Sequence, residues 1–143
     1  MTASKIIMKK QRIQCDGGSR GNPGPAAAGS VLIKDDSVVD TATAFLGIAT
    51  NNLAEYHSVL LGIDLMRKND LTSCDFYLDS QLVVRQLNGQ YKVKHPDMIM
   101  KYKEVQQAMT GLELRFHHVP RADNVEADAA VNQCLDLALD KKS

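Results

Sequence analysis

The sequence lacks an excess of charge of either sign, because its 143 residues carry 17 Lys and Arg against 17 Asp and Glu. The net charge therefore provides no overall attraction for a polyanion, and such a partner must be bound by local basic patches or by metal ions. Hydrophobic residues make up 44% and charged residues 24%, as in an ordinary soluble domain. A chain of this length can bury a full core.

Cysteine is also scarce, and long apolar runs are missing. Cys15, Cys74 and Cys134 are far apart and show no Cys-X-X-Cys spacing, which indicates reduced, buried thiols in a reducing compartment. The N-terminal residues have no apolar core of signal-peptide length, and no run approaches the roughly 18 apolar residues of a membrane span. We therefore expect a cytoplasmic monomer with no membrane partner and no obligate protein partner.

No repeat, low-complexity segment or linker divides the chain, so we expect one domain over 10–139, with a lead-in at 1–9 and a tail at 140–143. The fold class is α/β: alternating patterns predict strands and 3.6-residue patterns predict helices. The first three strands should form an antiparallel meander, and the fourth and fifth should run parallel to the first in one mixed sheet flanked by helices. The expected strands are 10–16, 27–34, 38–47, 74–79 and 112–119, and the expected helices are 52–69, 81–87, 97–110 and about 124–139.

The glycine-rich stretch from Cys15 to Gly29 offers an acidic residue, Asp16, at the end of the first strand. We expect this strand to stop at Gly17, because glycines favour turns, and we expect the glycines to keep the strand end clear of side chains. Such an end suits a metal ion and a bulky anionic substrate. The alternative is an ordinary connector that carries a solvated Asp.

Two further carboxylates are placed by neighbouring elements. Asp79 ends the strand predicted at 74–79, and parallel neighbours would bring it to the same sheet edge as Asp16, about 5 Å away. Glu55 lies in the first turn of the 52–69 helix, for which Asn51 and Asn52 are the expected N-cap residues. Its helix face is apolar, which points it toward buried surface, although Asn52 to Glu55 also fits a capping box.

Asp128 lies on an apolar stripe of the last helix, one turn before Val131. A charge there is costly unless it is paired or binds a cation, although it also suits the positive end of the helix dipole. Should all four carboxylates converge, they would require hard divalent cations, and an all-oxygen set selects Mg²⁺ or Mn²⁺ over Zn²⁺. Two such ions roughly 4 Å apart suit in-line phosphodiester hydrolysis.

The chain resembles the type 1 ribonuclease H family over about residues 10–139. Four motifs in matching order carry the resemblance: Asp16–Pro25, Thr50–Glu55, Asp79–Gln81 and Asn124–Asp128. The segment at 87–94 is similar to that of the compact branch found in archaea and some bacteria, which lacks the basic handle of other members. With zero net charge as well, affinity for a nucleic acid should be modest and steeply salt-dependent.

The resemblance implies hydrolysis of the RNA strand of RNA–DNA hybrids, leaving 5′-phosphate and 3′-hydroxyl ends, with two Mg²⁺ or Mn²⁺ ions. It assigns the metal-binding and catalytic quartet to Asp16, Glu55, Asp79 and Asp128. It also implies minor-groove and 2′-hydroxyl contacts, which distinguish RNA from DNA, and a contact near a DNA phosphate. The substrate-binding positions that match are Asn22, Thr50, Asn51, Asn52 and Gln81.

A residue that assists turnover is less sharply assigned. His118 precedes Asp128 by ten residues, as the mobile histidine of the family does, but Arg121 is the alternative if His118 ends the strand. Two other functions compete with hybrid cleavage. One is a nuclease of the same fold acting on another duplex, such as double-stranded RNA, and the other is a non-catalytic hybrid-binding module.

Overall fold

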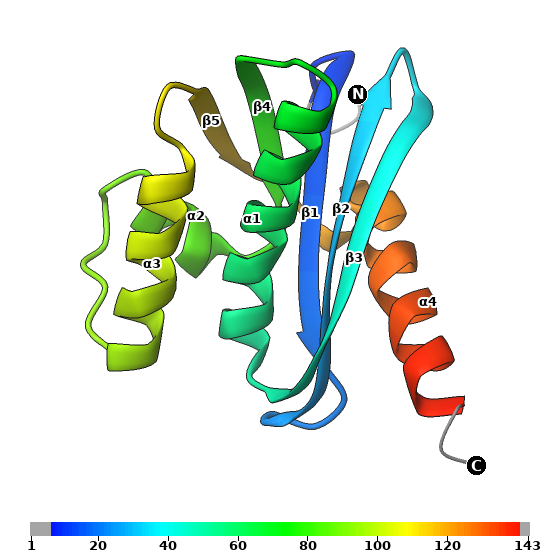
Figure 1. Cartoon of the computed structure of the whole chain (residues 1–143), viewed down its shortest axis with the longest axis vertical. Helices are drawn as coiled ribbons and strands as arrows, with labels where there is room; N and C mark the ends of the chain where they lie inside the picture. The colour runs from blue at the N-terminus through cyan, green and yellow to red at the C-terminus, as the bar shows by residue number, and fades with distance from the viewer. Residues whose placement is uncertain (1–6, 141–143) are drawn as a thin grey trace, which may run out of the picture.

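In the part of the chain that the structure describes, five strands form one mixed sheet in the order β3-β2-β1-β4-β5 (Figure 1). The pairs β1–β2 and β2–β3 are antiparallel, whereas β4 runs parallel to β1 and β5 parallel to β4. The predicted α/β fold with a mixed five-stranded sheet is thereby confirmed. The strands are β1 (Gln11–Ser19), β2 (Gly24–Lys34), β3 (Ser37–Ala49), β4 (Ser73–Leu78) and β5 (Glu113–His118).

The computed structural model describes residues 7–140. Residues 1–6 of the expected lead-in and residues 141–143 of the expected tail lie outside this range. Within 7–140, no helix combines the length and the apolarity that crossing a membrane requires.

The first strand is longer than predicted and does not stop at Gly17. It continues through Gly17 and Gly18 to Ser19, because β2 supplies partners as far as Ala26 on the antiparallel side. The parallel ladder with β4 ends earlier, at the pair Cys15 and Leu78. Asp16 therefore lies inside β1, one residue beyond its pairing with β4.

Within residues 7–140, four α-helices and a short 3₁₀ helix accompany the sheet. Thr50 caps the first of them, and its Oγ1 accepts a hydrogen bond from the Leu53 N–H at 3.2 Å, so the expected caps Asn51 and Asn52 were wrong. Ser80 caps the second as predicted, with its Oγ accepting from the Val83 N–H at 3.3 Å. The helices are α1 (Asn51–Lys68), α2 (Gln81–Leu87), α3 (Pro96–Ala108), η1 (Arg121–Asp123) and α4 (Val125–Asp140).

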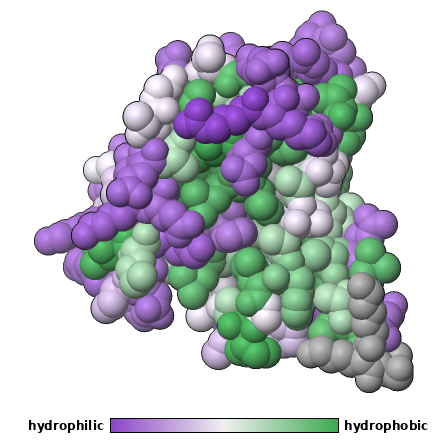
Figure 2. All heavy atoms as spheres, in the orientation of Figure 1, coloured by the Kyte–Doolittle hydropathy of each residue, from purple (hydrophilic) through white to green (hydrophobic). Residues whose placement is uncertain are grey.

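The helices cover opposite faces of the sheet (Figure 1). Leu32 packs in the main core with α1, α2 and α3, whereas its neighbours Val31 and Ile33 face α4 with Ala127, because successive strand residues point to opposite faces. Hydrophilic residues gather over α3 and the segment before it, and the surface over β3 is paler and more apolar (Figure 2). A site at the C-terminal end of β1 can therefore receive side chains from both layers.

Candidate metal centre and its pocket

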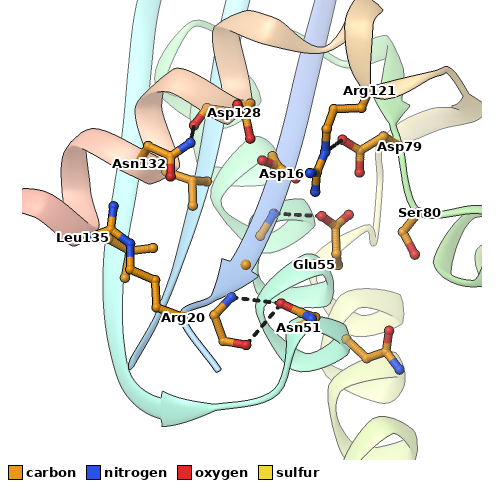
Figure 3. Close-up of a pocket in the computed structure, with 15 residues that line it drawn as sticks. Asp16, Arg20, Asn51, Glu55, Asp79, Ser80, Arg121, Asp128, Asn132 and Leu135 are labelled. Atoms are coloured by element: carbon orange, nitrogen blue, oxygen red, sulfur yellow. Dashed lines mark hydrogen bonds and ion pairs between the residues drawn. The ribbon is translucent and has the colours of Figure 1, made fainter. Parts of the chain in front are cut away.

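Three carboxylates meet where β1 leaves its pairing with β4. Ligand oxygens of Asp16, Glu55 and Asp79 all lie within 4.8 Å of one another. Asp16 comes from β1, Glu55 from the first turn of α1, and Asp79 directly follows β4. The three side chains turn toward one another, with Asp128 on the far side of Asp16 (Figure 3).

Gly17 is the residue that lets Glu55 reach this centre. A Cβ on Gly17 would lie 2.2 Å from the carbonyl carbon of Ala54 and 2.4 Å from the Glu55 nitrogen, so the first turn of α1 rests directly on β1. Glu55 Oε1 accepts a hydrogen bond from the Gly17 N–H at 2.7 Å. Glu55 is thus a buried residue of the centre, and the capping-box alternative is wrong. Gly17 thus makes a close helix–strand contact, and that the glycines keep the strand end clear of side chains for a substrate stays a prediction.

Asp128 approaches the centre from the other layer. Cys15 faces the α1 side of the sheet, so Asp16, the next residue, points to the side that α4 covers. The half-buried Asp128 lies on α4 close enough to Asp16 to contribute to the rise of its pKa. It is not part of the group within 4.8 Å, and so three of the four predicted ligands form the tight cluster.

The cluster suits a hard cation. Among the described residues, the buried oxygens Glu55 Oε2 and Asp79 Oδ2 make no hydrogen bond. Burial raises the pKa of Asp16 to about 7 and, with the charges of Asp16 and Asp79, raises the pKa of Glu55 well above its usual range. Burial also raises the pKa of Asp79, against the opposing charge of Arg121. A divalent ion would stabilise the charged form of these buried carboxyls and would bind the oxygens that lack a hydrogen bond, and the all-oxygen set fits Mg²⁺ or Mn²⁺.

These shifts give the metal-free protein a defined pH dependence. The folded state holds a proton on Asp16 between about pH 4 and 7 that the unfolded chain has already lost. The free energy of unfolding should therefore fall as pH rises through this window, by on the order of 4 kcal/mol from Asp16. Urea denaturation in EDTA across this range measures the slope, which Asp16→Asn should largely remove. A stability that rises steadily through the window would contradict the prediction.

The carboxylates form the floor of a pocket of about 490 Å³. Arg121 lines it, with its Nε 3.9 Å from Asp79 Oδ2 and its side chain 79% exposed. His118 is the last residue of β5, is exposed, and does not line this pocket. Of the two turnover candidates, Arg121 is the one that faces the pocket.

Four of the five predicted substrate-binding residues line this pocket or a neighbouring hollow. Asn51 and Asn52 line the pocket, while Asn22, Thr50 and Asn52 line a neighbouring hollow. Two of these residues also hold the rim together: Asn51 Oδ1 accepts from the Ser19 N–H at 2.8 Å, and Asn22 Oδ1 accepts from the Asn51 N–H at 3.0 Å. Gln81 is exposed at the start of α2 and lines neither cavity.

Sequence reasoning missed four polar residues of the pocket, Ser19, Arg20, Ser80 and Asn132. Ser80 was predicted only as a helix cap. Asn132 follows Asp128 by one helical turn, so helical spacing could have placed it on the same face. For Arg20 the local sequence holds no such signal beyond its place in the glycine-rich stretch.

Comparison with known proteins adds an independent finding. A family model described as "Reverse transcriptase-like" matches residues 14–134. The bifunctional protein Rv2228c of Mycobacterium tuberculosis is 41% identical over 129 residues, which cover 88% of this chain and 35% of that protein. The solved N-terminal RNase H domain of that protein superposes with a TM-score of 0.86 at 39% identity, covering 93% of this chain and 98% of that one.

Two further relatives have similar identities. Ribonuclease HI of Halobacterium salinarum is 40% identical over 125 residues, which cover 86% of this chain and 63% of that protein. LC11-RNase H1, isolated from compost and solved in complex with an RNA/DNA hybrid, has a TM-score of 0.84 at 36% identity, covering 91% of this chain and 99% of that one. The chain thus spans about a third of the first curated relatives it matches and nearly all of the solved domains.

Proposed function

The chain belongs to the ribonuclease H family, and we propose that it hydrolyses the RNA strand of RNA–DNA hybrids with Mg²⁺ or Mn²⁺, leaving 5′-phosphate and 3′-hydroxyl ends. The observation that carries the proposal is the convergence of Asp16, Glu55 and Asp79 within 4.8 Å, with two buried oxygens that lack a hydrogen bond. A hybrid-binding module without catalysis would have no use for such a costly cluster.

The carboxylates of Asp16, Glu55 and Asp79 would hold the ions, and Asp128 would complete the set from α4. A bound pair of ions supplies activation of a water and stabilisation of the leaving 3′ oxygen. The chain itself contributes rigid placement: the Gly17 N–H holds Glu55, the interior of β1 holds Asp16, and the end of β4 holds Asp79. Oxygens of Asp16, Glu55 and Asp79 are therefore held close together before a cation binds.

Recognition of RNA would fall to the rim. The amides of Asn22, Asn51 and Asn52 can donate to and accept from a 2′-hydroxyl, which DNA lacks. Gln81 would act from the start of α2, and Thr50 would stand near a phosphate of the DNA strand. Because Asn22 and Asn51 are fixed by hydrogen bonds to their neighbours, this rim is preorganised for contact in a minor groove.

Arg121 is our choice for the residue that assists turnover. Its exposed guanidinium lies against Asp79 at the edge of the pocket, where charge changes as a phosphodiester is cleaved. His118 is the last residue of β5 and lies outside the pocket lining, so it could take part only by moving into the pocket.

A substrate panel tests the proposal. Matched duplexes of one sequence, made as RNA–DNA hybrid, double-stranded RNA and double-stranded DNA, are incubated with the protein in Mg²⁺, in Mn²⁺ and in EDTA. We expect metal-dependent cleavage of the hybrid, confined to its RNA strand, with 3′-hydroxyl ends detected by polymerase extension. Preferred cleavage of double-stranded RNA would support the rival nuclease, and tight binding without metal-dependent cleavage would support the binding module.

A further inference from the structure

Arg20 stands at the end of the pocket opposite to Arg121 (Figure 3). Within the described part of the chain, these two are the cations among the residues that line the pocket, and the carboxylates lie between them. Arg20 lies beside Leu135 and on the same side as Asn132, both from α4. The cavity therefore continues past the acidic cluster to an end that carries a guanidinium and an amide.

The present partner of Arg20 is weakly held. Its Nη2 lies 2.6 Å from Asp136 Oδ1, and the two side chains are 41% and 62% exposed. An exposed ion pair contributes little net stability, so Arg20 can exchange this partner at small cost. A guanidinium binds a phosphate through two parallel hydrogen bonds, which an exposed carboxylate cannot outcompete once the phosphate is positioned by other contacts.

We propose that Arg20 releases Asp136 and itself binds a backbone phosphate of the cleaved strand. This phosphate is the neighbour of the one that lies at the carboxylate cluster, so Arg20 helps to position the strand. The inference rests on the proposed function and gives the far end of the same pocket a role in binding a phosphate. A strand that crosses four carboxylates meets repulsion at each neighbouring phosphate, and a chain of zero net charge must offset it locally. Asp136 is then a competitor that holds Arg20 until the nucleic acid arrives.

A purely structural role makes a different prediction from the proposed one. The Arg20–Asp136 pair joins the loop after β1 to α4, and if that were its purpose, loss of either partner would have the same effect. As competitor and ligand, the two residues must instead act in opposite directions on binding. The sign of the two effects therefore distinguishes the roles.

The experiment compares Arg20→Ala, Asp136→Asn and the double variant. KM and kcat are measured on a labelled hybrid in Mg²⁺, and Kd is measured by fluorescence anisotropy on the metal-free protein. We expect Arg20→Ala to raise KM and Kd about tenfold, with kcat changed less than about twofold. Asp136→Asn should lower both constants about threefold, and the double variant should match Arg20→Ala.

Two controls sharpen the result. Arg20→Lys keeps the charge and should stay within about threefold of wild type, and Arg20→Ala should reduce the slope of log affinity against log salt by about one. Equal shifts of KM and Kd in the two single variants, or no shift in Arg20→Ala, would overturn the inference. If wild-type protein cleaves the hybrid, such a result leaves the proposed function intact. If it does not cleave, that function fails, and the metal-free Kd still decides the role of Arg20.

Discussion

Asp16→Asn is expected to reduce cleavage of an RNA–DNA hybrid by at least about 100-fold while the fold survives. Loss of a residue that only hydrogen-bonds to a metal ligand typically lowers metal affinity or activity about 10–100-fold, and Asp16 would be a ligand itself. The substitution keeps the size of the side chain and removes a carboxyl whose pKa burial raises to about 7. In EDTA at pH 8, the melting temperature should therefore equal or exceed that of wild type. Initial rates in Mg²⁺ and thermal unfolding in EDTA measure the two effects.

The matched control is Asp64→Asn, an exposed acid on α1 outside the pocket, which should retain both rate and stability. If Asp16→Asn cleaves at a rate near that of wild type, Asp16 is not a metal ligand. If the variant loses melting temperature along with activity, the loss reflects folding and says nothing about the metal.

Gly17→Ala should be among the most destabilising single-methyl additions in this chain. The new Cβ would stand 2.2 Å from the Ala54 carbonyl carbon and 2.4 Å from the Ala54 oxygen, and backbone atoms cannot move aside as a flexible side chain can. Overpacking of this kind costs about 3 kcal/mol or more, a large share of a typical domain's stability. Urea denaturation with an unchanged m-value would report it as a lower midpoint.

Gly18→Ala is its control, one residue further along β1. The nearest atom to a Cβ there is Asn51 Oδ1 at 4.0 Å, which is ordinary contact distance. We expect a change within about 0.5 kcal/mol, as for substitutions that meet no packing constraint. Similar midpoints for the two variants would show that α1 can withdraw from β1, and the account of how Glu55 is positioned would be wrong.

The order of elements was predictable from local patterns, because alternation and helical spacing separate cleanly in this chain. Ser80 was identified as a cap from its place alone. The extent of β1 was not predictable, since Gly17 and Gly18 are turn signals locally and only their antiparallel pairing with β2 keeps them extended. Thr50, Asn51 and Asn52 can all cap a helix, and their order alone does not decide which one does.

The candidate site likewise has features that the local sequence predicts and features that it does not. That Asp16 and Asp79 lie close together follows from parallel neighbouring strands, and the burial of Glu55 follows from its apolar helix face. The position of Glu55 in the centre, however, depends on its contact with Gly17 of β1, and these two residues are 38 positions apart in the sequence. The pairing of Arg20 with Asp136 spans 116 residues, and no local pattern encodes it.

The hydrogen bond from the Gly17 amide to Glu55 also decides which parts of the centre can move. It ties the acidic cluster to the central strand β1 and to α1. Core strands and helices of this kind are in general the elements that open last in native-state hydrogen exchange. Arg20 and Arg121 instead extend from a loop and from η1 on exposed side chains, which change rotamer in picoseconds to nanoseconds. Under the proposed function, adaptation to an incoming strand and release of a cut one would therefore fall to the cations at the two ends of the pocket, while the anions between them stay fixed.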